Sequence, residues 1–231
     1  MAAGSPLALT FDDGPGPSTE RLLDVLGEHG AHATLFCLGR NLRGEALDGD
    51  GDRAVAIAAR AVREGHALGN HTMSHAFALS EPELLAELAA CDALVAACYR
   101  SAGADAPAAP AVRLPFGAAR RDLPVSLGTL ARIGRPHHHW TASFGDWRPE
   151  RDARELADAM VSHAIAMWQD GRVPILLLHD AGQGAGDDGA AYGVVRDATV
   201  AAVAQFCARL APRGLRYLTA TGSGADTLPW P

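Results

Sequence analysis

Short apolar runs alternate with amphipathic helical patterns along nearly the whole chain of 231 residues, and this alternation most constrains the fold. The runs with the length and composition of buried strands are 7–11, 33–38, 66–70, 111–115, 137–142, 173–179 and 215–220. The helical patterns between them cover 18–30, 52–65, 80–100, 121–133, 150–171 and 193–211. Strands that are separated by helices usually pair in parallel, so the sequence predicts an α/β fold, as an open doubly wound sheet or a barrel.

Helix-capping residues support several of these boundaries. Ser18 and Asp52 stand where two helices are expected to begin, and both are residue types that favour the N-cap. Ser80 and Glu83 have the spacing of a capping box at the start of the longest helix. No linker composition and no internal repeat interrupt the pattern, so residues 1–231 are predicted to form a single domain.

Composition and charge limit the classes of partner. The chain is 48% hydrophobic and 20% charged, which is typical of a globular domain with a substantial core. The net charge is −7 and no long basic run occurs, so nucleic acid and an anionic membrane surface are not expected partners. No oligomeric state is predicted from these properties.

The N-terminal segment and the cysteines bear on cellular location. Residues 1–11 lack the basic and long apolar regions of a signal peptide, and no stretch reaches transmembrane length. The expectation is a cytoplasmic protein as the sequence stands, or a secreted one whose leader has been removed. The four cysteines lack metal-site spacing and are expected to be buried thiols: Cys37, Cys91, Cys98 and Cys207.

Chemically reactive side chains follow five of the predicted strands. They are Asp12 and Asp13 after the first strand, His71 and His75 after the third, Arg113 at the fourth, Asp146 and Trp147 after the fifth, and His179 at the end of the sixth. The carboxyl ends of parallel strands share one face of an α/β fold, and active sites form there. We therefore expect these side chains to converge on one site.

The two histidines after the third strand are candidates for metal ligands. His71 and His75 are spaced i, i+4, which on a helix places both rings on one face within reach of one ion. The alternative is a pair of ordinary loop or helix histidines. A catalytic zinc ion usually has three protein ligands and an open position, and a carboxylate from the pair in "TFDDGP" would complete a His-His-Asp set.

The remaining carboxylate and the last histidine suit proton transfer. An Asp-Gly pair is also a common turn, so the aspartates alone do not require a catalytic role. A carboxylate beside a metal site can act as a general base, and Arg113 is the candidate cation that would keep it ionised. His179 can act as a general acid if a carboxylate such as Asp146 raises its pKa; the alternative is a histidine that binds or orients the metal site.

The motifs "TFDDGP", "HTMSH", "RLPFG", "DW" and "LLH" stand in the order of the five motifs of the polysaccharide deacetylases. The chain resembles this family, also called carbohydrate esterase family 4 or the NodB homology domain, over roughly residues 6–219. The resemblance implies a distorted (β/α)7 barrel with parallel strands and outer helices. It also implies metal-dependent removal of acetyl groups from N-acetylated, or in some members O-acetylated, sugars, with one divalent ion, most often zinc.

The resemblance also implies a role for individual residues. Asp12 resembles the general base of the family, and Arg113 resembles the arginine that tethers this base. Asp13, His71 and His75 resemble the metal ligands. His179 resembles the general acid, and Asp146 resembles the residue that tunes the pKa of this acid. The Phe116 backbone N–H would hold the oxyanion with the metal, Trp147 would line the pocket, and Leu177 would contact the acetyl methyl. Ser143 departs from the family pattern, which often has an aspartate there, and this departure concerns the substrate pocket.

Two other functions are compatible with such a scaffold. One is hydrolysis of a small non-sugar amide, such as a ureide or a cyclic imide, and the absence of a visible signal peptide favours it. The other is non-catalytic carbohydrate binding. A pure binding protein does not need an acid, a base and a metal site together, so the complete set of motif residues favours an enzyme acting on an acetylated glycan.

Overall fold

The computed structural model of the chain describes residues 4–117, 124–148, 150–182, 184–185, 191–192 and 195–220. The strands are β1 Ser5–Asp12, β2 Ala33–Cys37, β3 Ala67–Asn70, β4 Ala142–Ser143, β5 Ile175–His179, β6 Gly184–Ala185, β7 Ala191–Tyr192 and β8 Leu215–Tyr217. The α-helices are α1 Thr19–Glu28, α2 Gly39–Leu42, α3 Gly51–Arg63, α4 Glu81–Ala102, α5 Pro124–Arg132, α6 Ala153–Gln169 and α7 Asp197–Leu210. Two short 3-10 helices are η1 Glu45–Leu47 and η2 Ala211–Arg213.

The parallel strands form a closed ring. The main sheet has the order β3-β2-β1-β5-β4, and isolated parallel bridges join Asn70 of β3 to Val112 and Val112 to His137. His137 and β4 belong to the same extended segment, and β4 pairs with β5. The pairing therefore continues from β3 through Val112 and this segment back to β5, which closes the ring. β8 pairs only with the start of β1, from Ser5 to Leu7. The predicted α/β class with parallel strands and outer helices is confirmed, and the barrel is distorted where these pairings are short.

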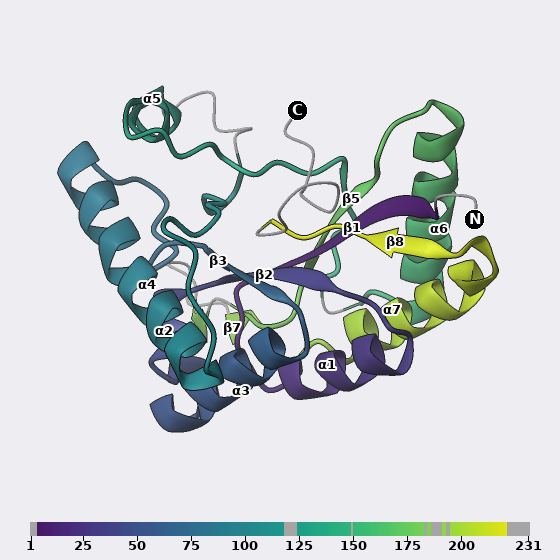
Figure 1. Cartoon of the computed structure of the whole chain (residues 1–231), viewed down its shortest axis with the longest axis horizontal. Coiled ribbons are helices and arrows are strands. Elements are labelled where there is room, and N and C mark those ends of the chain that lie inside the picture. The colour runs from purple at the N-terminus through teal and green to yellow at the C-terminus, as the bar shows by residue number, and fades with distance from the viewer. Residues whose placement is uncertain are drawn as a thin grey trace.

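The helices cover the outside of this ring. In Figure 1, α4, α3, α1, α7 and α6 follow one another around the strands, and α5 lies apart beyond the upper end of α4. Alternate residues of β1 face different layers: Leu7, Leu9 and Phe11 join the large core under the helices. Thr10 and Asp12 are buried on the other face of the strand, inside the ring. No helix in the described part of the chain is long and apolar enough to cross a bilayer.

Two predicted strands are much shorter than expected. The run 111–115 contributes only the bridges of Val112, because Pro110 precedes it, Pro115 ends it, and proline has no N–H to donate to a ladder. The run 137–142 is reduced to the His137 bridge and the first residue of β4. Between them, the carbonyls of residues 138 and 139 accept hydrogen bonds from Arg113.

The helix boundaries follow the predictions with one correction. Ser18 stands at the N-cap of α1, and the capping box of Ser80 and Glu83 is present at α4. Asp52 was the wrong cap for α3. Asp50 is the N-cap, and its side chain accepts the Arg53 backbone N–H, while Asp52 lies in the first turn, where a negative charge is also favourable.

The remaining predicted elements differ mainly in length. Residues 121–123 and 193–194, at the ends of two predicted helices, lie outside the described residues. The last strand is confined to β8. The cysteine prediction is confirmed: the four thiols are buried and none is in a disulfide.

Candidate active site

The ring brings the predicted reactive residues to one end of its strands. Asp12 ends β1 and Asp13 follows it, His71 and His75 follow β3, Arg113 follows the bridge residue Val112, Asp146 and Trp147 follow β4, and His179 ends β5. Asp12 and His179 are direct neighbours in the parallel register of β1 and β5. The rule that carboxyl ends of parallel strands share a face therefore holds for this chain.

Asp13, His71 and His75 form a group of potential metal ligands. Oδ1 of Asp13 lies 3.5 Å from Nε2 of His71 and 3.5 Å from Nε2 of His75. All three side chains are buried, and theirs is the one such group of three or more among the described residues. Two donor atoms at zinc-ligand distances from one ion, in tetrahedral geometry, are about 3.4 Å apart, so the spacing fits a shared ion.

The hydrogen bonds and pKa values of this group also fit a cation. Oδ1 of Asp13 is buried without a hydrogen-bond partner, and burial raises the pKa of Asp13 from 3.8 to about 7. Burial lowers the pKa of His71 to about 3 and that of His75 to about 2, so both rings are neutral and can act as ligands. Nδ1 of His71 lies 2.7 Å from the Arg113 carbonyl, and donation there leaves the Nε2 lone pair directed at Asp13.

The two histidines come together through a loop, so the helical geometry predicted for them was wrong. Residues 71–75 are not helical, and Thr72 and His75 have φ angles of 69° and 59°. Glu87 of α4 fixes the loop, because one of its carboxylate oxygens accepts the backbone N–H groups of Met73 and Ser74, both at 2.9 Å. Its other oxygen accepts the Ser74 hydroxyl at 2.6 Å. This carboxylate, together with the hydrogen bonds that the Thr72 and Met73 carbonyls accept from α2, therefore holds the two rings in position.

Left-handed backbone is concentrated at the site. The described part of the chain contains five non-glycine residues with positive φ, and four of them surround the candidate ligands: Asp13, Thr72, His75 and Phe116. Each such conformation costs about 1–3 kcal/mol and persists only where the surrounding structure holds it. The sharp turns at these residues direct side chains and backbone toward the same space.

Arg113 holds Asp12 from inside the ring. Nη1 of Arg113 donates to Oδ1 of Asp12 and to the Thr10 hydroxyl, both at 2.8 Å. The other guanidinium nitrogens donate to the carbonyls of His138 and His139. Arg113 has no solvent exposure, and a buried cation needs such partners. Oδ2 of Asp12 lies 3.7 Å from Nε2 of His71, on the side of the metal-ligand group.

Asp146 holds His179. Oδ1 of Asp146 lies 2.9 Å from Nδ1 of His179, and its Oδ2 accepts the His179 backbone N–H and the Thr199 hydroxyl. Burial by itself would lower the pKa of His179, but the Asp146 charge and hydrogen bond outweigh burial and raise the pKa from 6.5 to about 9. His179 is therefore protonated at neutral pH. The Trp147 ring packs edge-on against the imidazole, with centroids 5.2 Å apart.

The turn that carries both aspartates is clamped from behind. Oδ2 of Asp180 accepts the Thr19 hydroxyl at 2.6 Å, and Thr19 Oγ1 accepts the Gly16 backbone N–H. A Cβ atom on Gly14 would lie 2.2 Å from Asp180 Oδ2, so only glycine fits there. The Asn41 amide donates to the Asp13 carbonyl at 2.6 Å. Sequence reasoning had not singled out Asp180.

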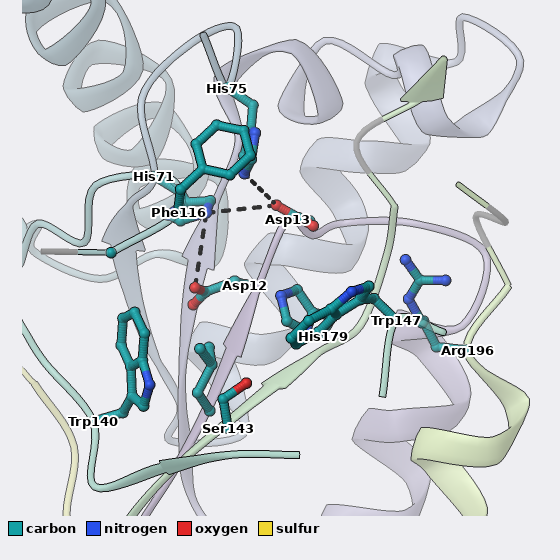
Figure 2. A pocket seen from close by; sticks show the side chains of 12 residues that line it. Asp12, Asp13, His71, His75, Phe116, Trp140, Ser143, Trp147, His179 and Arg196 are labelled. Carbon is teal, nitrogen blue, oxygen red and sulfur yellow. Dashed lines mark ion pairs between the residues drawn. The ribbon is translucent and has the colours of Figure 1, made fainter. Parts of the chain in front are cut away.

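These groups face one cavity of about 390 Å³, a volume suited to a small molecule or one unit of a polymer (Figure 2). Its lining residues are Asp12, Asp13, His71, His75, Phe116, Gly117, Trp140, Ser143, Trp147, Leu177, His179 and Arg196. Arg113 and Asp146 do not line the cavity and act through Asp12 and His179. In Figure 2, Asp13 and the two histidines lie on one side of the cavity, and His179, Trp147 and Arg196 on another.

Two large lining residues were missed by sequence reasoning. Arg196 is the N-cap residue of α7, and its backbone N–H donates to the Ser18 hydroxyl. It stands at the start of a helix and does not directly follow any of the predicted strands, so the strand-end rule could not find it. Trp140 lies in the shortened run 137–142, where its aromatic ring beside three histidines was the available signal.

Comparison with known proteins identifies the family. The polysaccharide deacetylase family model matches residues 2–127. A chitooligosaccharide deacetylase of Bradyrhizobium sp. (strain ANU 289) is 32% identical over 210 residues, covering 89% of this chain and 84% of that protein. A peptidoglycan-N-acetylglucosamine deacetylase of Bacillus cereus is 28% identical, covering 92% of this chain and 85% of that protein.

The fold is similar to that of solved relatives. A family 4 acetyl xylan esterase from Clostridium thermocellum, in complex with a cobalt ion, matches with a TM-score of 0.67 and 25% sequence identity. The match covers 94% of this chain and 89% of that one. Because the family model spans more than half of the chain and the relatives cover most of the rest, the chain belongs to the polysaccharide deacetylase family.

Proposed function

We propose that the protein is a metal-dependent hydrolase that removes acetyl groups from N-acetylated sugars of an oligosaccharide or polysaccharide. The observation that carries this proposal is that three kinds of group line one cavity: the potential metal ligands, the Asp12 carboxylate and the His179 imidazole. Buried Arg113 holds Asp12, and buried Asp146 holds His179. The named activities of the relatives from Bradyrhizobium and Bacillus cereus support acetylated amino sugars as the substrate class.

The proposed metal ligands are Asp13, His71 and His75, and zinc is the proposed ion. Two imidazole nitrogens and one carboxylate oxygen are a ligand set that zinc takes in hydrolases, and it leaves positions open for water and substrate. The relative that was solved with a cobalt ion supports a divalent metal at this site. When bound, the ion supplies a Lewis acid that polarises the acetyl carbonyl and makes a coordinated water more acidic.

Asp12 is the proposed general base. Its Oδ1 is held by Arg113, while its Oδ2 lies on the side of the metal-ligand group and can accept a proton from the attacking water. The water oxygen adds to the amide carbon. Arg113 holds this buried carboxylate in position through an ion pair.

His179 is the proposed general acid. Its Nδ1 is held by Asp146, so the ring presents Nε2 to the cavity, and the raised pKa keeps a proton there. That proton passes to the amide nitrogen as the C–N bond breaks, giving acetate and a free amine. The Phe116 backbone N–H is the proposed second oxyanion donor, and Leu177, which is buried at the cavity wall, is the proposed contact for the acetyl methyl.

An acetate-release screen tests the proposal. The purified protein, loaded with zinc, is incubated with chitooligosaccharides, peptidoglycan fragments, acetylated xylan and small amides including a ureide and a cyclic imide. Acetate with matching free amine from the amino-sugar glycans supports the proposal. Acetate from xylan alone indicates an esterase, and ammonia or ring opening without acetate indicates a small-amide hydrolase. Glycan binding without any turnover indicates a binding protein. Each of these three results overturns the proposal.

A further inference from the structure

Two exposed phenylalanines lie beside the cavity and contact each other. The exposed fraction is 60% for Phe77 and 46% for Phe116, and among the described residues these are the exposed phenylalanines. Their ring centroids are 5.5 Å apart in an edge-to-face arrangement. On its other side the Phe116 ring packs edge-on against His75, with centroids 4.5 Å apart. An aromatic surface therefore runs from the metal-ligand group to the exterior.

Exposure of one apolar side chain is ordinary on a protein surface. Four large aliphatic side chains are also exposed in the described part of the chain, and none of them lines the cavity: Leu85, Leu127, Ile133 and Val195. The phenylalanine pair differs because it is aromatic, contiguous, and joined to the cavity through Phe116, which lines it. Figure 2 shows the Phe116 ring in front of His71 and His75, at the edge of this space.

The backbone around Phe77 is anchored on both sides. Before it, Ser74 donates its backbone N–H and its hydroxyl to Glu87. After it, Ser80 donates its backbone N–H and its hydroxyl to Glu83 at the start of α4. A ring that is held between two anchored points loses little conformational entropy when a ligand packs on it. Phe77 therefore offers a preorganised apolar face.

We propose that Phe77, together with Phe116, binds the sugar ring next to the one whose acetamide enters the cavity. This inference rests on the proposed glycan deacetylase function. One face of a pyranose carries several C–H groups, which are apolar and slightly positive, and they complement the negative face of an aromatic ring. The occupant is a neighbouring unit of the same glycan chain, because the aromatic surface is continuous with the cavity. The enzyme consequently prefers oligosaccharides to a single amino sugar.

Four Phe77 variants and one control test this preference. Steady-state kinetics are measured on N-acetylglucosamine and on chitobiose through chitopentaose, for wild type, Phe77→Ala, Phe77→Leu, Phe77→Tyr, Phe77→Trp and Ile133→Ala. In Phe77→Ala, the ratio of kcat/KM for chitotetraose to kcat/KM for the monomer is expected to fall about five- to tenfold, which corresponds to the loss of one aromatic contact. The fall should come from a higher KM for chitotetraose. Phe77→Leu keeps an apolar side chain but no ring, so it should behave like Phe77→Ala. Phe77→Tyr and Phe77→Trp should retain the preference.

Calorimetric binding of chitotetraose to Asp12→Asn, alone and combined with Phe77→Ala, measures the same contact without turnover. Weaker binding in the double variant supports the inference. Equal binding, or an unchanged chain-length ratio in Phe77→Ala, overturns it while leaving the deacetylase function intact. A Phe77→Leu variant that keeps the full ratio also overturns stacking as the cause. A wild type that releases no acetate from any glycan overturns the proposed function itself, and this inference with it.

Discussion

Asp146 contacts His179 twice: one carboxylate oxygen lies 2.9 Å from Nδ1 of the ring, and the other accepts the backbone N–H at 2.8 Å. The carboxylate thereby fixes both the orientation and the charge of the imidazole. It also raises the pKa of His179 to about 9 despite burial, so the ring is protonated at neutral pH.

Replacing this carboxylate should shift the pH profile. A general acid must be protonated, so activity persists below the His179 pKa and is lost as the pH rises through it. Asp146→Asn removes the largest charge that raises the His179 pKa and leaves burial opposed by the smaller effects of Asp13 and Asp12, so the alkaline limb should move to lower pH and the rate should fall about 10²–10⁴-fold. A pH–rate profile measures both effects. Thr199→Val, which removes one hydrogen bond but keeps the charge, is the graded control; an alkaline limb at the same pH in Asp146→Asn would exclude His179 as the acid.

Metal binding should depend on the protonation of Asp13. The pKa of this carboxyl is raised to about 7 by burial, and a metal ligand must be ionised, so affinity should weaken as the pH falls below about 7. The pKa values of His71 and His75 are far lower, so their rings stay neutral over this range. Calorimetry with zinc in buffers of different ionisation enthalpy should detect proton release that grows as the pH decreases from 8 to 6. Proton release that does not change with pH would contradict the role of Asp13.

Separate substitutions should divide metal binding from proton transfer. His71→Ala should lose the ion, because it removes one ligand, while Asp12→Asn should retain about one ion per chain and lose turnover. Elemental analysis of the dialysed proteins together with acetate release measures both. Turnover at the wild-type rate in Asp12→Asn would show that another group is the base.

Glu87 should control metal affinity without contacting the ion. Glu87→Ala frees the backbone at Met73 and Ser74, so the two histidines lose their fixed positions, and zinc affinity should drop about 10–100-fold. A zinc competition titration with a chromophoric chelator gives the change. Glu64→Ala, which removes a surface pair with Arg60, is the matched control for loss of one carboxylate. If both variants bind zinc alike, the loop does not depend on Glu87.

Removing the buried arginine should be costly to stability. In Arg113→Met the Asp12 carboxylate stays buried without its cation, and breaking such a pair costs about 3–5 kcal/mol of unfolding free energy. Urea unfolding measures the loss. The double variant Asp12→Asn/Arg113→Met should recover part of it, because the uncompensated charge is gone; a double variant that is no more stable than Arg113→Met would assign the loss to packing instead.

The alternation of apolar runs and helices was enough to predict the parallel fold, and strand ends were enough to predict where the reactive residues meet. The length of the strand in run 137–142 was not predictable from the run, because Arg113 takes the carbonyls of His138 and His139 that would otherwise pair between strands. Whether these carbonyls bond to a neighbouring strand or to Arg113 depends on a side chain from another segment, so the local sequence pattern cannot predict it.

The candidate site was predicted least well where it departs from regular structure. The spacing of His71 and His75 predicted that the two rings lie close together, and they do, but the helical reason for it was wrong because both lie in a loop next to Glu87. Their role as metal ligands stays a prediction. Arg196 lines the cavity from the start of a helix, and Phe77 lies beside the cavity in the segment between His75 and α4, so neither stands directly at the end of a predicted strand.

The left-handed residues around the candidate ligands make the site vulnerable during protein engineering. Thr72 carries no proposed ligand or proton-transfer role, yet its φ of 69° disfavours every side chain relative to glycine. A library that is selected for heat resistance alone should therefore enrich glycine at positions such as 72 and 75, and the latter change removes a proposed metal ligand. Variants from such a library would gain thermal stability and lose activity. Engineering this enzyme for stability therefore needs an activity screen at every round.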